Sequence, residues 1–135
     1  IDWRPSEKWR LQGSYSYLNI HTDSNPEFKQ MDSTSGGANK ANPRHQLSFR
    51  SHYDFSDRLQ LNLWLRYVSG LTFFNIPNYI TMDTKLAWKP SRNIEFFVVG
   101  QNLFSQYHRE SQSDFIPSMA TQIPRGVYAG AEWRF

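Results

Sequence analysis

The chain has 135 residues, of which 16% are aromatic and 20% charged, and its formal net charge is +3. It contains no cysteine and no run near the roughly 20 apolar residues that a transmembrane helix needs, which excludes disulfides, thiolate chemistry and a helical membrane protein. Its aromatic content argues against disorder, and its charge excess is too small to indicate nucleic-acid binding.

Apolar and polar residues alternate along most of the chain, which is the period of a β-strand with two different faces. In chain order, the pattern predicts the end of a strand at 1–3 and strands at 9–17, 46–55, 59–67, 79–88, 93–104 and 127–135. The middle of 93–104 is apolar on both sides, so its two faces stay unassigned. Several of these strands reach the roughly 9–11 residues that a tilted strand needs to cross a bilayer.

The connections between the predicted strands alternate in length. Those at 4–8, 56–57 and 89–92 are short, that at 69–78 is intermediate, and those at 22–42 and 105–125 are long. Tight turns at one end of a sheet and larger loops at the other are typical of an outer-membrane β-barrel.

Aromatic residues gather at the short-turn end. Six of them lie next to a short turn or the C-terminus: Trp3, Trp9, Phe55, Trp88, Trp133 and Phe135. Amphipathic rings prefer a membrane interface, so we expect an aromatic girdle at this level. The alternative is that these rings plug the end of a soluble β core.

Charged residues occupy one of the two strand faces. We expect the following to face a barrel lumen: Arg10, Arg50, Asp54, Arg66, Asp83, Lys85, Glu132 and Arg134. No charge falls on the middle of the opposite face, where an Arg or Lys in contact with lipid would cost about 2–4 kcal/mol.

The last residues, 128–135, resemble the signal by which the outer-membrane assembly machinery recognises barrel proteins. Gly130, Trp133 and Phe135 match that signal, and Tyr128 is a weak fit to its polar position. The resemblance implies that these residues form the assembly signal of this chain.

More of the chain resembles the C-terminal barrel region of TonB-dependent receptors. The stretches that carry the resemblance are 63–68, 79–83, 99–104 and 124–128, among them Asn102-Leu103-Phe104 and Pro124-Arg125. The family implies a barrel of about 22 strands around an N-terminal plug, in the outer membrane of a Gram-negative bacterium.

The fold class expected is therefore all-β, an antiparallel transmembrane β-barrel segment of about six strands and the end of a seventh. Residues 1–135 would form the C-terminal part of the barrel domain, without a plug or a TonB box. Six strands cannot close around such a lumen, and open edges in lipid are costly, so the segment alone should not function. A signal peptide encoded directly before Ile1 would contradict this hypothesis.

The family also implies a function, namely TonB-energised uptake of a scarce nutrient, commonly a ferric siderophore. Membrane lipid, the assembly machinery, TonB acting through the plug and the small-molecule ligand are the implied partners, and no cofactor is implied. Loop residues that suit an anionic chelate are Phe73, Phe74, Tyr107, His108 and Arg109. The alternative is that these residues only close the loops over the barrel.

Other functions were weighed against transport. His108 and Glu110 could contact a metal directly, but a loop His and Glu held by their neighbours explain the pair as well, and we predict no metal site. Ser48, His52 and Asp54 share a face, but Ser48 and His52 lie about 13 Å apart by strand rise, so we predict no enzyme. A soluble β-sandwich binding module remains the alternative fold.

Overall fold

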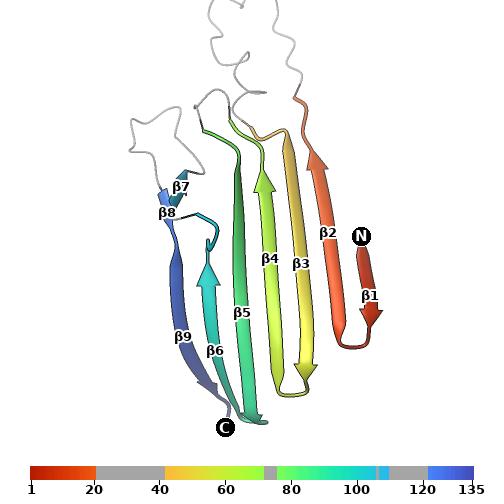
Figure 1. Ribbon diagram of the computed structural model, residues 1–135, viewed down its shortest axis with the longest axis vertical. Coiled ribbons are helices and arrows are strands. Elements are labelled where there is room, and N and C mark those ends of the chain that lie inside the picture. Colours follow the sequence, from red (N-terminus) through yellow and green to blue (C-terminus); the bar gives the residue numbers. More distant parts are fainter. Residues whose placement is uncertain (21–41, 72–75, 106, 110–121) are drawn as a thin grey trace, which may run out of the picture.

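The computed structural model describes residues 1–20, 42–71, 76–105, 107–109 and 122–135. Seven strands of these residues form one antiparallel sheet in the order β1-β2-β3-β4-β5-β6-β9, as Figure 1 shows. The strands are β1 (Asp2–Ser6), β2 (Trp9–Tyr17), β3 (His45–Ser56), β4 (Leu59–Val68), β5 (Tyr79–Ser91), β6 (Ile94–Gln101) and β9 (Gly126–Trp133). The predicted set of strands is confirmed, with ends that differ by a few residues.

The segment 105–125, predicted to be a loop, holds two short strands. β7 (Tyr107–Arg109) and β8 (Gln122–Pro124) pair with each other in an antiparallel two-stranded sheet. This small sheet lies beyond the upper ends of β6 and β9 in Figure 1.

Short turns join the strands at one end of the sheet and long connections join them at the other (Figure 1). The two-residue turns fall at 7–8, 57–58 and 92–93. β1 runs three residues further into the predicted turn, to Ser6, with an irregular register between Trp3 and Ser6. Pro5 is tolerated there because it lies where the register to β2 is irregular, as prolines within sheets do at bulges.

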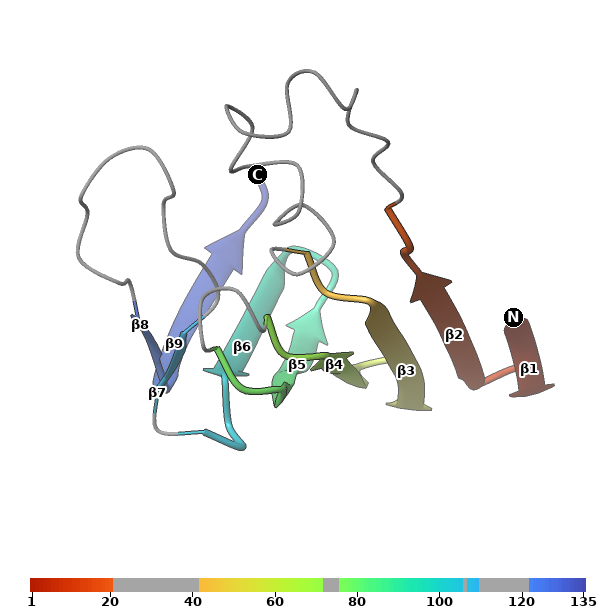
Figure 2. The same cartoon turned by 90° about the horizontal axis from the view of Figure 1, so that it is seen from above.

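The sheet is a single layer. Seen from above, its strands follow an open arc whose two edges, β1 and β9, do not meet (Figure 2). Within the described ranges the only buried apolar side chains are Leu71, Ile76 and Ala87, and no second sheet or helix covers either face. Also within those ranges, no helix has the length and apolarity to span a membrane.

Strand pairing assigns the two faces of β6, which the sequence pattern left open. Phe97 pairs with Ala87 of β5, and Val99 pairs with Lys85, so both belong to the face that carries the charges. Phe96 stacks on Trp88 of the opposite face, with ring centroids 5.9 Å apart. β6 therefore has two distinct faces, and apolar residues fill two of its polar-side positions, Phe97 and Val99.

Candidate functional site

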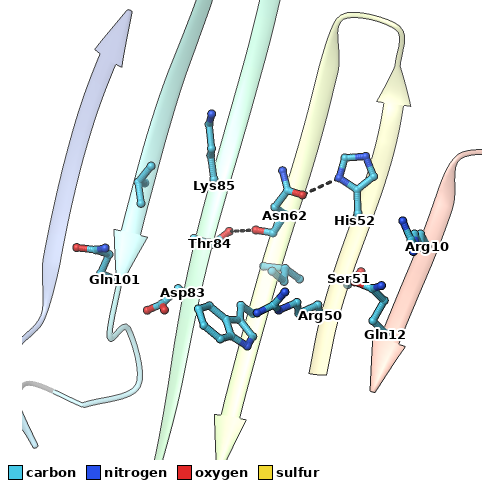
Figure 3. Close-up of a pocket in the computed structure, with 13 residues that line it drawn as sticks. Arg10, Gln12, Arg50, Ser51, His52, Asn62, Asp83, Thr84, Lys85 and Gln101 are labelled. Atoms are coloured by element: carbon cyan, nitrogen blue, oxygen red, sulfur yellow. Dashed lines mark hydrogen bonds between the residues drawn. The ribbon is translucent and has the colours of Figure 1, made fainter. Parts of the chain in front are cut away.

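The charged face of the sheet contains a hollow of about 380 Å³ near the middle of the strands (Figure 3). Two rows of directly paired residues form its floor, because opposite residues in antiparallel strands share a face. One row is Gln12, Arg50, Trp64 and Asp83, and the other, nearer the short turns, is Arg10, His52, Asn62, Lys85 and Val99. All predicted lumen-side charges on β2 to β5 lie on this face, which we call the polar wall.

Trp64 organises the polar wall. The guanidinium carbons of Arg50 and Arg66 lie 4.4 and 4.3 Å from its ring centroid, a cation–π arrangement on a single indole. Its Nε1 donates a hydrogen bond of 2.8 Å to the Ser48 hydroxyl, which fixes the orientation of the ring. The indole is thus the support on which both guanidinium groups rest.

Most cations of the polar wall have a carboxylate partner. The ion pairs are Arg10 with Asp2, Arg66 with Asp83 (3.0 Å), Lys85 with Glu95 (2.8 Å), Lys89 with Glu95 (3.6 Å) and Arg134 with Glu132 (2.8 Å). Among the wall cations that the structure describes, Arg50 alone has no carboxylate partner. Its positive charge faces the hollow uncompensated, so the hollow suits an anionic or aromatic group.

Asn102 links the polar wall to β8. The residue is 3% exposed and has a left-handed φ of 52°. Its backbone N–H donates to Asp83 Oδ1 (2.9 Å), and its side-chain amide donates to the carbonyl of Ile123 (2.9 Å). Because Asp83 also holds Arg66, one bonded chain runs from the wall to the strand pair β7-β8.

The opposite face is apolar and uncovered. Leu61, Leu63 and Leu65 of β4 are half-exposed, with neighbouring strands beside them and no described element over them. Large apolar side chains elsewhere on this face are more exposed, among them Phe49, Ile80, Leu86 and Val98. A single-layer sheet with this face would be unstable in water, where such patches are rare on monomeric proteins.

The six aromatic residues predicted to share one level are all exposed and near the short turns. Trp133 pairs with Ile94, the first residue after the turn at 92–93. Edge-to-face contacts join Trp9 to Tyr53 and Trp133 to Phe135, with ring centroids 6.0 and 6.2 Å apart. They form an exposed aromatic band rather than a plug inside a core.

The predicted ligand contacts fall largely outside the described residues. This applies to Phe73 and Phe74, and also to Glu110 of the metal alternative. Tyr107, His108 and Arg109 form β7, with their backbone paired to β8 and their side chains not described. Sequence reasoning missed Glu95, Phe97 and Gln101 on the polar wall, because only strand pairing assigns the faces of β6. These predicted ligand contacts stay predictions.

The residues weighed as a catalytic group, Ser48, His52 and Asp54, do not form a catalytic triad on the polar wall. The Ser48 hydroxyl accepts from Trp64, whereas His52 contacts Asn62 (2.6 Å) and Asp54 (3.3 Å). The described residues contain no group of three or more His, Asp or Glu side chains placed to hold a metal.

Comparison with solved structures gives a clear likeness. No protein-family model matches the chain, and no curated protein matches it. The fold superposes on the ferric-catecholate import receptor Fiu from E. coli K12, in its closed form, with a TM-score of 0.69. The chain has the fold of a TonB-dependent receptor barrel segment.

The coverage of the match agrees with an open sheet rather than a closed barrel. The match to Fiu covers 99% of this chain and 20% of the Fiu chain, at 20% sequence identity. The expected antiparallel barrel segment is therefore confirmed as a fold, and the alternative of a β-sandwich is not supported, since the described strands build no second layer.

Proposed function

We propose that residues 1–135 form the C-terminal part of the barrel of a TonB-dependent receptor that imports a ferric siderophore across the outer membrane of a Gram-negative bacterium. The observation that carries the proposal is the single-layer sheet, which is apolar and uncovered on one face and charged on the other. Lipid would cover the first face and a lumen would adjoin the second, as in outer-membrane barrels. The plug, through which TonB acts, would belong to a longer protein.

The ligand assignment rests on two features. The long connections join the strands at one end of the sheet (Figure 1). The sequence of these connections offers rings and positive charge at Phe73, Phe74, Tyr107, His108 and Arg109. Below them, the polar wall offers the uncompensated guanidinium of Arg50. Fiu is described as a ferric-catecholate import receptor, and an anionic catecholate chelate would suit both places.

A binding measurement tests the ligand assignment. The full-length receptor in detergent is titrated with a ferric catecholate complex, and quenching of its tryptophan fluorescence gives the dissociation constant. We expect Arg109→Ala to raise that constant about tenfold or more, since losing a charge-assisted contact costs about 1.5–3 kcal/mol. Arg92→Ala is the matched control, because Arg92 lies in a short turn at the opposite end of the sheet.

Two results would contradict the proposal. Equal loss of binding in Arg109→Ala and Arg92→Ala would show that the ligand does not bind at the long-loop end. Absence of any quenching by the wild-type receptor, with the receptor folded, would remove the ferric catecholate as ligand.

A further inference from the structure

β9 contacts β6 through the aromatic ring of Phe97, which lies against Gly130. On the polar side, Phe97 of β6 pairs directly with Gly130 of β9. A methyl group placed on Gly130 would lie 2.5 Å from Cζ of Phe97 and 3.0 and 3.1 Å from its two Cε atoms. These distances are below van der Waals contact, so the ring occupies the space that any larger residue at 130 would need.

The ring is held from its other sides as well. Ala87 of β5 pairs with Phe97 from the opposite direction and is 3% exposed, so a small residue flanks the ring on each neighbouring strand. The ammonium of Lys85 lies 4.7 Å from the ring centroid and is itself held by Glu95 at 2.8 Å. Phe97 is therefore contacted from both neighbouring strands, and Gly130 leaves the space that its ring occupies.

Apart from this contact, neither strand propensity nor backbone conformation favours glycine at position 130. It weakens a strand interior, and its φ here is not in the left-handed region. Gly126 of the same strand differs, because a methyl group there would meet no atom within 4 Å. The two glycines of β9 thus provide an internal comparison between an occupied and an open position.

We propose that Phe97 is the positioning residue that seats β9 on β6, and that Gly130 serves the C-terminal assembly signal by receiving this ring. The signal then divides into two parts with different physical roles, Gly130 acting within the molecule. Trp133 (71% exposed) and Phe135 (fully exposed) remain available to an external partner such as the assembly machinery. This inference rests on the proposed outer-membrane function.

The test is a compensating double substitution in the full-length receptor expressed in its host. The folded fraction in outer-membrane preparations is measured from the heat-dependent shift in electrophoretic mobility. We expect Gly130→Ala to lower this fraction several-fold, because the added methyl group displaces the ring from the strand interface. Gly126→Ala should leave it unchanged.

The double variant Gly130→Ala with Phe97→Val should recover most of the folded fraction, since valine keeps strand propensity and leaves room for alanine. Phe97→Val should not restore the folded fraction of Trp133→Ala, because Trp133 does not act through the ring of Phe97. A double variant that stays as low as Gly130→Ala would overturn the proposal, because glycine would then be read directly by a partner. A Gly130→Ala variant with an unchanged folded fraction would also overturn the proposal. Because this readout is folding and not uptake, a wild type that folds without importing iron would count only against the ligand assignment.

Discussion

At the scale of single residues, the structure explains the motif Asn102-Leu103-Phe104. The sequence predicts a strand through 104, but β6 ends at Gln101, and Asn102 adopts a left-handed conformation. Asparagine tolerates that conformation better than other residues with a Cβ atom. Its amide then bonds Ile123, so the residue both ends the strand and anchors the chain that returns to β9.

Substitution separates these two roles of Asn102. Asn102→Gly keeps the backbone conformation and loses the amide, whereas Asn102→Ala loses both. We expect Asn102→Ala to destabilise the receptor more than Asn102→Gly, by about 1 kcal/mol, because alanine is strained at positive φ. The measurement is the temperature at which the folded electrophoretic band of the full-length receptor disappears. Equal temperatures for the two variants would show that the left-handed backbone carries no cost there.

At the scale of elements, the strands present a polar face on one side of the sheet and an apolar face on the other. β4 shows this most clearly, because Leu61, Leu63 and Leu65 alternate with polar-wall residues such as Asn62 and Trp64. Its register to β5 is unbroken, and its register to β3 is regular from residue 60 to residue 68. A shift by one residue would exchange the two sets, so the period of the sequence fixes which face is which.

Adjacent substitutions on β4 test this division. We expect Leu63→Arg to lower the amount of receptor in the outer membrane, since an Arg in the middle of a lipid-facing strand costs about 2–4 kcal/mol. Asn62→Arg, one residue away, faces the hollow and should be tolerated. Both are quantified by immunoblot of outer-membrane fractions, and equal tolerance of the two would contradict the assignment of faces.

At the scale of the whole molecule, the seven-stranded sheet has two free edges and almost no core. Among the described strands, β1 and β9 each pair on one side only, and the large apolar side chains of one face are exposed. Such edges and patches cause association in water. In the proposed function, further strands would pair with these edges and lipid would cover the apolar face.

The 135-residue chain by itself should consequently not give a folded monomer in detergent-free buffer. We expect size-exclusion chromatography to show aggregates, with β-structure gained only in detergent micelles or lipid. A soluble folded monomer with dispersed amide resonances would instead support the β-sandwich alternative.

The sequence alone predicted much of the architecture. Alternation located six strands of the main sheet and the end of a seventh, and it assigned the faces of all but β1 and β6, since the period of a strand is local. Loop lengths predicted the two unlike ends. The grouping of Gly130, Trp133 and Phe135 as an assembly signal comes from a resemblance and stays a prediction.

Only the tertiary structure decided the faces of β6 and the contacts between residues on different strands. The faces of β6 depended on pairing with β5 and β9, because a strand that is apolar on both sides carries no period. The pairing of Arg50 and Arg66 on Trp64, the bond from Asn102 to Ile123 and the seat of Phe97 on Gly130 each join residues on different strands. The sequence determined the two faces of the wall, but the contacts across it depend on register and distance, which exist only once the strands are paired.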